Sequence, residues 1–331
     1  MNNKVVMLSL AVLILGILFV HERYAHHHQS LEKALIEGYV NIEEFGAKGN
    51  DDKDDSSAIQ EAIDYGVKHK LGKVKVTGNQ RFILRKGILL KQGIELELGK
   101  NTTIEVQGDF RVFEIMKNSS ITNGVIEVSD QNFSSEVLYF DGEQRFWSWE
   151  TTRIEGVNII NTSDKNMGTA IALVADQSNE FISFIDFLSL KIVGFRMGIL
   201  IKAEVPVEKF NFVNGNRFTN LTFDDCVKCI VLDSSKSIPN EVSGNQFTDI
   251  QIQMSDDTEG VLHVSGSDNR FQGMIWDVET YASDTTVVKF SDQSMRNSVV
   301  TNVDKAYMVD QGDDNSYFPQ TGSTYGSSFK Q

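Results

Sequence analysis

Large apolar residues recur along most of this chain in a short pattern, in which one apolar residue is followed by others three and five positions later. The pattern starts at seven positions, the first and last more loosely: Ile121, Ile154, Phe187, Phe218, Phe247, Phe271 and Val299. Successive starts are 24 to 33 residues apart by subtraction. A repeat of this length is typical of a β-solenoid, in which each turn buries its apolar side chains against the neighbouring turns.

A second apolar alternation recurs once in each turn and predicts a second strand. It comprises the pairs Ile199-x-Ile201, Ile230-x-Leu232, Leu262-x-Val264, Val288-x-Phe290 and Tyr307-x-Val309. Because side chains alternate across a strand, the residue inside each pair is expected on the outer surface: Leu200, Val231, His263, Lys289 and Met308. In the first pattern, the copy that starts at Phe271 places Met274 and Trp276 inside.

Asparagine stands two residues before the phenylalanine in three successive turns, at Asn216, Asn245 and Asn269. Turns of a solenoid stack about 4.8 Å apart, which lets side-chain amides in register hydrogen-bond along the axis. The spacing therefore predicts an asparagine ladder with a structural role.

Residues at about 55–69 carry a helical pattern instead. Apolar residues recur on one face at Ile59, Ala62, Ile63 and Val67, and three residues can cap the helix: Asp54, Asp55 or Ser57. Gln60 follows Ser57 by three positions, as in a capping box. We expect the helix to lay its apolar face over an apolar surface.

The segment from residue 40 to residue 63 resembles the N-terminal signature of the pectate-lyase-like superfamily. The matching residues are Phe45-Gly46-Ala47, Asp54-Asp55 and Ala58-Ile59-Gln60-Glu61-Ala62-Ile63. The resemblance implies an all-β fold, a single-stranded right-handed parallel β-helix, with the helix capping its N-terminal end. It implies little about the reaction.

Residues 5–20 form an uncharged apolar run behind Lys4, which is typical of a signal peptide core or a signal anchor. No small-x-small cleavage site follows, so we expect an uncleaved anchor within residues 1–24 and the rest of the chain outside the cell. Cleavage and secretion are the alternative. The expected organisation continues with a linker at 25–39, the β-helix domain at 40–318 and a loose tail at 319–331.

A net charge of −15 disfavours nucleic acid as the main partner. The resemblance instead implies a polysaccharide or a cell-envelope glycan as the partner, with the membrane contacted through the N-terminal segment. Cys226 and Cys229, the only cysteines, are expected to be buried thiols rather than a redox pair or a zinc site. The sequence does not decide between a monomer and a homo-oligomer.

One position before each start of the repeat, the alternation predicts an outward column. Its members are Arg153, Asp186, Arg217, Gln246 and Arg270. Side chains of alternating charge at this spacing can neutralise one another, or the arginines Arg153, Arg217 and Arg270 can bind the carboxylates of an acidic glycan.

Asp224 and Asp225 follow one repeat strand directly, and paired carboxylates are what glycoside hydrolysis needs. In polygalacturonase-like members of the superfamily an Asp-Asp motif carries catalysis, and the resemblance implies that role for this pair, with Asp186 as a further candidate. The family's Gly-His-Gly and Arg-x-Lys motifs have no counterpart here. No metal site is expected from the spacing, although a lyase mechanism would bring in Ca²⁺.

Trp147 and Trp149 share one face of an extended segment and are flanked by charged residues, which is typical of a platform for sugar rings. The alternative is that both indoles pack against the solenoid. The leading hypothesis is thus a cell-surface protein that cleaves an extracellular or envelope polysaccharide by hydrolysis or elimination. The second is a membrane-tethered β-helix that binds glycan or scaffolds a surface assembly without turnover.

Overall fold

The computed structural model describes residues 34–204, 210–234, 241–281 and 286–319. The predicted anchor and most of the predicted tail lie outside these residues. Within the described part of the chain, no helix is long and apolar enough to span a membrane.

The structure is nearly all-β, and every pairing between its strands is parallel. The first sheet has 17 strands: β1 (Tyr39–Asn41), β2 (Lys73–Val76), β3 (Arg81–Leu84), β5 (Glu95–Leu98), β6 (Thr103–Val106), β8 (Ser120–Thr122), β9 (Val125–Val128), β11 (Arg153–Glu155), β12 (Asn158–Asn161), β15 (Asp186–Leu188), β16 (Lys191–Val193), β19 (Arg217–Thr219), β20 (Thr222–Asp224), β23 (Gln246–Gln253), β25 (Arg270–Trp276), β27 (Ser298–Thr301) and β29 (Ser316–Pro319).

The second sheet has 12 strands: β4 (Ile88–Leu90), β7 (Phe113–Ile115), β10 (Glu136–Asp141), β13 (Thr169–Ala175), β14 (Phe181–Ser183), β17 (Met197–Ala203), β18 (Phe212–Asn214), β21 (Lys228–Asp233), β22 (Val242–Ser243), β24 (Gly260–Ser267), β26 (Val288–Met295) and β28 (Met308–Asp310). The helices are α2 (Ser56–His69), α3 (Val278–Tyr281) and the 3₁₀ turns η1 (Ile42–Phe45), η2 (Gly142–Gln144) and η4 (Lys305–Tyr307).

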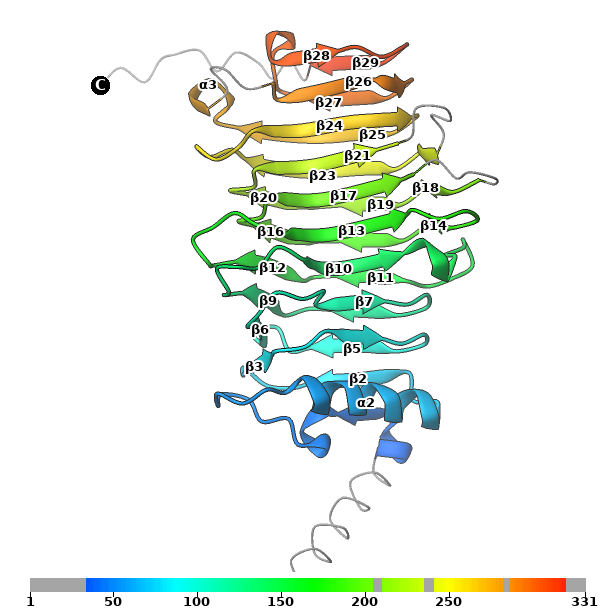
Figure 1. Cartoon of the computed structure of the whole chain (residues 1–331), viewed down its shortest axis with the longest axis vertical. Coiled ribbons are helices and arrows are strands. Elements are labelled where there is room, and N and C mark those ends of the chain that lie inside the picture. Colours follow the sequence, from blue (N-terminus) through cyan, green and yellow to red (C-terminus); the bar gives the residue numbers. More distant parts are fainter. Residues whose placement is uncertain (1–33, 205–209, 235–240, 282–285, 320–331) are drawn as a thin grey trace, which may run out of the picture.

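Each coil of the chain runs along the second sheet, bends, and returns along the first sheet in two short strands, as in β13, β14, β15 and β16 (Figure 1). The next coil repeats this path one strand spacing further along the axis. Parallel strands joined by such crossovers make a right-handed parallel β-helix, the fold that the resemblance implied.

The predicted repeat is confirmed by the strand register. Ile121, Ile154 and the four phenylalanines that follow stand opposite one another in successive coils. Inside the coil the rings stack, with centroids 4.5 Å apart for Phe187 and Phe218, and 4.4 Å apart for Phe218 and Phe247. These side chains are almost wholly buried, so each coil is stabilised chiefly by its two neighbours.

The asparagine ladder is also confirmed, and it is longer than predicted. Side-chain amides donate from Asn216 to Asn245, onward to Asn269 and Asn297, and finally to Asn315, over 3.0 to 3.1 Å at each step. Each of these oxygens also accepts the backbone N–H of the preceding ladder residue, for example Asn245 N at 3.0 Å from Asn269 Oδ1. The ladder therefore satisfies backbone groups at a corner that no strand pairing reaches.

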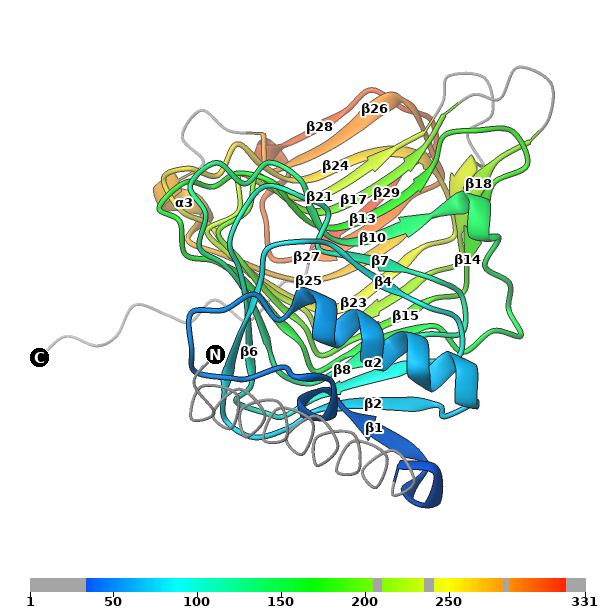
Figure 2. The same ribbon diagram turned by 60° about the horizontal axis from the view of Figure 1, so that its bottom comes forward.

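Helix α2 lies beside the first coils, next to β1, β2 and β4 (Figure 2). It buries Ile59, Ala62 and Ile63 as predicted, but Gly66 completes the buried face and Val67 is 40% exposed. The expected capping box is wrong: Gln60 instead accepts from Leu89 N and donates to Leu89 O in β4.

Both aspartates of the N-terminal signature tie the start of the helix to the coil. Asp54 accepts the N–H groups of Ser56 and Arg85, while the buried Asp55 accepts those of Lys48 and Ile83. The side chains that define the signature thus fix α2 to the solenoid, whereas the role of this helix as a cap stays a prediction.

Two details of the predicted register are wrong by one residue. At the last coil Val309 rather than Met308 stands beside Lys289, because the strand begins one residue later than its apolar pattern suggests. In β25 the backbone lacks the extra residue that bulges out of β23 at Asp249, so Gly273 and Ile275 pair with Ile250 and Ile252. Met274 and Trp276 consequently face outward.

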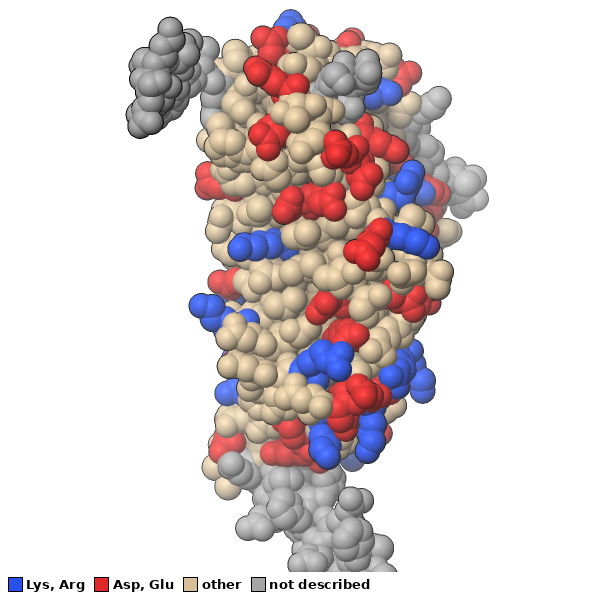
Figure 3. All heavy atoms as spheres, turned by 90° about the vertical axis from the view of Figure 1, so that its left-hand side faces the viewer, with Lys and Arg blue, Asp and Glu red and all other residues tan. Residues whose placement is uncertain are grey.

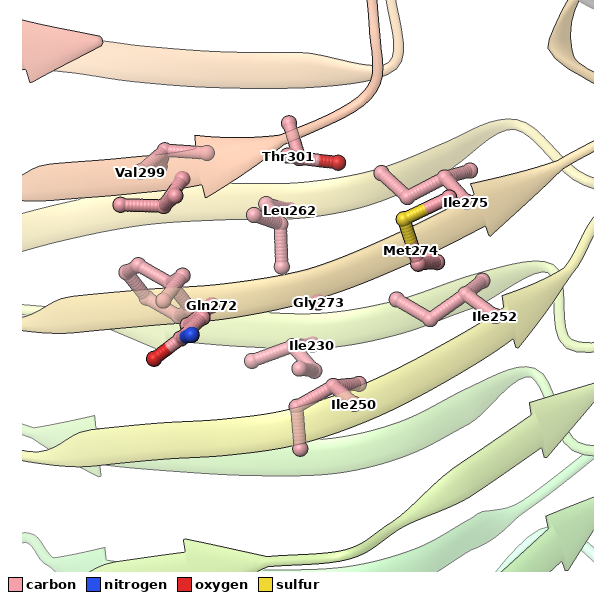
Figure 4. A pocket seen from close by; sticks show the side chains of 12 residues that line it. Ile230, Ile250, Ile252, Leu262, Gln272, Gly273, Met274, Ile275, Val299 and Thr301 are labelled. Carbon is pink, nitrogen blue, oxygen red and sulfur yellow. The ribbon is translucent and has the colours of Figure 1, made fainter. Parts of the chain in front are cut away.

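The shortened strand leaves a cavity in the core of this coil (Figure 4). Gly273 stands where the preceding coils carry Leu221 and Ile250, so the volume of a large side chain is missing. The cavity has a volume of about 20 Å³ and is partly open to the surface, and apolar side chains such as Ile230, Ile252 and Leu262 line most of it.

We expect Asn269→Ala to lower the free energy of unfolding by at least about 2 kcal/mol, because it leaves the buried backbone N–H of Asn245 without its acceptor and removes the donor to Val242 O. Urea denaturation measures the loss. Asn132→Ala, at an exposed position, is the matched control and should change stability by less than about 0.5 kcal/mol. Equal effects of the two substitutions would contradict the structural role of the ladder.

Gly273→Ala should cost roughly 1–3 kcal/mol even though it adds volume beside a cavity. A Cβ on Gly273 would lie 2.2 Å from the carbonyl oxygen of Ile250, so the two coils would have to separate. Gly72→Ala is the control, since its Cβ would meet nothing closer than 3.9 Å. Thermal unfolding of both variants tests the close approach, and a stabilised Gly273→Ala protein would refute it.

Candidate functional site

Trp147 and Trp149 lie on a turn that projects from the coil between β10 and β11. The turn is closed by the backbone N–H of Glu150, which donates to Trp147 O at 3.0 Å, and by Glu150 Oε2, which accepts from Trp147 N at 2.8 Å. The indoles stack with centroids 5.4 Å apart. Their shared face, predicted from an extended segment, comes from this turn.

The tryptophans continue into an aromatic strip contributed by the next two coils. The strip consists of Trp149, Trp147, Phe181, Phe212 and Phe210, whose neighbouring centroids are 4.3 to 5.9 Å apart. Register pairing of β14 with β18 places Phe181 directly beside Phe212. Its two ends are open to solvent, with Trp149 72% and Phe210 57% exposed.

A groove of about 580 Å³ runs next to the tryptophan turn, along the start of the outward column. Polar uncharged side chains line much of it: Asn118, Ser120, Ser148, Thr151 and Thr152. Five charged side chains complete it: Glu95, Glu150, Arg153, Asp186 and Arg217. The groove and the aromatic strip meet at the segment 147–150, so one extended ligand could contact both.

The register of the predicted outward column is correct, since Arg153, Asp186, Arg217, Gln246 and Arg270 pair in that order. Two of its arginines are paired at the groove. Arg217 Nε lies 2.8 Å from Asp186 Oδ1 of the same column, and Arg153 Nε lies 3.2 Å from Glu155 Oε2, outside the column. The column is thus neutralised internally at Asp186 and Arg217, and glycan binding by its arginines stays a prediction.

The other two carboxylates of the groove are paired as well. Glu95 Oε2 lies 3.4 Å from Lys73 Nζ, and Glu150 Oε1 lies 3.7 Å from Lys117 Nζ. The Glu150 side chain is only 6% exposed. Both carboxylates therefore help to hold the groove's walls in place, the second by fixing the tryptophan turn.

Phe184 lines the same groove in an unusual backbone conformation. A left-handed residue occurs at one corner of each of six successive coils, at Phe184, Gly215, Gly244, Asp268, Arg296 and Asp314, with φ between 52° and 67°. A bulky residue in this region costs of order 1–3 kcal/mol. The Phe184 ring is nevertheless 43% exposed, so burial of its own surface offsets little of that cost.

A buried carboxyl group, that of Glu180, lies behind the aromatic strip. Glu180 is 8% exposed and accepts the N–H groups of Asp176 and Gln177, both at 2.9 Å. Burial raises the pKa of this carboxyl, and the nearby Asp141 and Asp176 add to the shift. Its hydrogen bonds hold the loop that carries Phe181.

The structure does not bring all of the predicted catalytic residues together. Asp186 starts β15, whereas Asp224 ends β20, where it pairs with Val193 at the far end of β16. Position 193 lies seven positions and a bend beyond position 186, which is roughly 20 Å of chain. Asp225, in a left-handed conformation, follows Asp224 at that far edge, and the two line no part of the groove.

In Figure 1, β16 and β20 lie on the left of the molecule, whereas β14, the strand directly before β15, lies on the right. Figure 3 views the molecule from the side of β20, where acidic and basic side chains intermix. Arg270 shares the outward column but lies two coils beyond Arg217 and outside the groove. Of the predicted residues, Trp147, Trp149, Arg153, Asp186 and Arg217 therefore gather at one site.

Sequence reasoning missed Phe181, Phe184, Phe210 and Phe212, all of which contribute to the aromatic strip or the groove. The one sequence signal that could have found any of them is that Phe210 and Phe212 lie directly before a turn of the repeat. Cys226 and Cys229 are free and buried, as predicted, and burial raises the pKa of the Cys226 thiol to about 12. Among the described residues, no cluster of His, Cys, Asp or Glu is arranged to hold a metal ion.

Neither a protein-family model nor a curated protein matches this sequence. Several solved structures are similar to this chain at low sequence identity. A Geobacillus virus E2 protein, ORF18, is 13% identical over 86% of this chain, with a TM-score of 0.48, and this chain spans 61% of its length. The A-module of the Azotobacter vinelandii mannuronan C-5 epimerase AlgE4 is 12% identical, covering 85% of this chain and 96% of its own, with a TM-score of 0.36.

A tailspike protein of the E. coli bacteriophage HK620, solved with a pentasaccharide, is 10% identical over 86% of this chain and 66% of its own, with a TM-score of 0.41. All three TM-scores lie below 0.5. The fold assignment therefore rests on the strand pairing of the chain itself.

Proposed function

We propose that this protein binds a polysaccharide across the groove and the aromatic strip beside it. The observation that carries the proposal is the junction of the two surfaces at residues 147–150, where an exposed apolar platform meets a wall of hydroxyl and amide groups. A sugar ring has apolar faces and a polar edge. Aromatic faces and hydrogen-bonding side chains in contact with each other suit both parts of such a ligand.

Tethering to the outside of a membrane through residues 5–20 remains part of this proposal. In that arrangement the β-helix would present its groove to glycans of the cell surface. Secretion after cleavage would leave the binding surface unchanged.

Hydrolysis of the bound glycan is the second candidate, and one observation favours it. Three carboxylates, Glu95, Glu150 and Asp186, line one groove, and a glycosidase needs two carboxyl groups on either side of the scissile bond. Asp224 and Asp225 lie too far away to join them. Elimination with Ca²⁺ stays a prediction. Of the residues that such a mechanism would need, the groove contains the carboxylate of Asp186 and the basic side chain of Arg217.

Electrophoresis of the full-length chain through gels that contain dissolved polysaccharides tests binding. We expect retardation by at least one polymer, and Trp149→Ala should weaken it roughly tenfold, because stacking against an exposed indole is lost. Trp276→Ala is the matched control, since this indole is 47% exposed but lies on a strand outside the groove. Retardation that both variants share equally with the wild type would contradict the proposed site.

Release of reducing ends from the retarding polymer distinguishes a hydrolase from a binder. If the groove hydrolyses glycan, Asp186→Asn and Glu150→Gln should each lower the rate at least a hundredfold, while Asp224→Asn leaves it unchanged. A hydrolase that loses its activity in Asp224→Asn would place the reaction at the far edge of β20. Binding without any release would identify a glycan-binding protein.

A further inference from the structure

Phe184 stands out among the left-handed corner residues because it alone carries an aromatic ring. The corners of the next two coils are glycines, which adopt this conformation without strain. An asparagine or a glycine would therefore fit the backbone at position 184 better than phenylalanine does. A strained conformation that is kept where the side chain remains exposed points to a ligand contact rather than to packing.

The next coil is shaped to receive the ring. A Cβ on Gly215 would lie 3.0 Å from Cε1 and 3.3 Å from Cδ1 of Phe184, so the ring rests directly over the Gly215 backbone. The backbone fixes one side of the ring, while the exposed remainder forms part of the groove. Phe184 thus offers a rigid apolar surface inside an otherwise polar groove.

The charges around this ring are already paired within the protein. Ion pairs border the groove: Lys73 with Glu95 and Glu97, Lys117 with Glu150, Arg153 with Glu155, and Arg217 with Asp186. Five acidic and four basic side chains give a formal charge of −1, so the groove has no surplus of positive charge. A polyanionic ligand would have to displace a carboxylate from its arginine and would approach a protein with a net charge of −15.

We infer that the groove takes an uncharged glycan, one sugar ring of which packs against Phe184. The inference rests on the proposed function and adds the class of glycan and a residue that selects it. Neutral sugar rings need no counter-charge, and their hydroxyl groups can bond to the serine, threonine and asparagine side chains of the groove.

The test uses the full-length chain with Phe184→Gly and Phe184→Asn, both of which suit a left-handed corner. Gels contain either neutral polymers (dextran, galactomannan, hydroxyethylcellulose) or acidic polymers (polygalacturonate, alginate). We expect a neutral polymer to retard the wild type equally at low and high salt, and both variants to bind about tenfold more weakly. Their thermal midpoints should equal or exceed that of the wild type, and Trp276→Ala should retain full binding.

Retardation by acidic polymers alone, weakening with salt, would overturn the inference while leaving the proposed function intact. Neutral binding that Phe184→Gly and Phe184→Asn preserve would overturn the role of the ring. A loss of thermal stability in both variants would show that the ring packs rather than binds. No retardation by any polymer would remove the proposed function and this inference together.

Discussion

The stacking of coils in register is the constraint on which the rest of this structure depends. Parallel pairing places each residue beside its counterpart about 4.8 Å along the axis, so a side chain can be surrounded by neighbours 24 to 33 residues away in sequence. The phenylalanine stack, the asparagine ladder and the ion pair of Asp186 with Arg217 all follow from this single relation. The aromatic strip does too, because Phe181 and Phe212 meet only through pairing of β14 and β18.

Periodicity in the sequence predicts the inward columns well because burial imposes the same residue types on every coil. Phe187, Phe218 and Phe247 have equivalent surroundings, and so they can be aligned without a structure. The prediction fails where a coil changes length, as in β25, since a missing residue within a strand exchanges its two faces. Met274 and Trp276 keep the apolar character of the pattern while standing on the opposite side.

The candidate site was harder to predict, because no repeat governs it. The tryptophan turn and Phe184 occur once, and their neighbours come from the bends between strands, where side-chain direction depends on local backbone conformation. Asp224 and Asp225 were predicted to be catalytic on the basis of their residue types alone. Which edge of the coil a carboxylate occupies is decided by the path of the strands, which pairs Asp224 with Val193 far from Asp186.

The left-handed corner lets the surface of the solenoid differ from coil to coil while its core stays the same. In the six coils from Phe184 to Asp314 the chain turns there through one left-handed residue, and the asparagine that follows it in five of them holds the turn. A residue at this corner can carry a side chain toward the surface, as Phe184 and Arg296 do, at the cost of a backbone strain that glycine avoids. A fold of this kind can alter what it recognises by single substitutions spaced along its axis, while its interior stays the same.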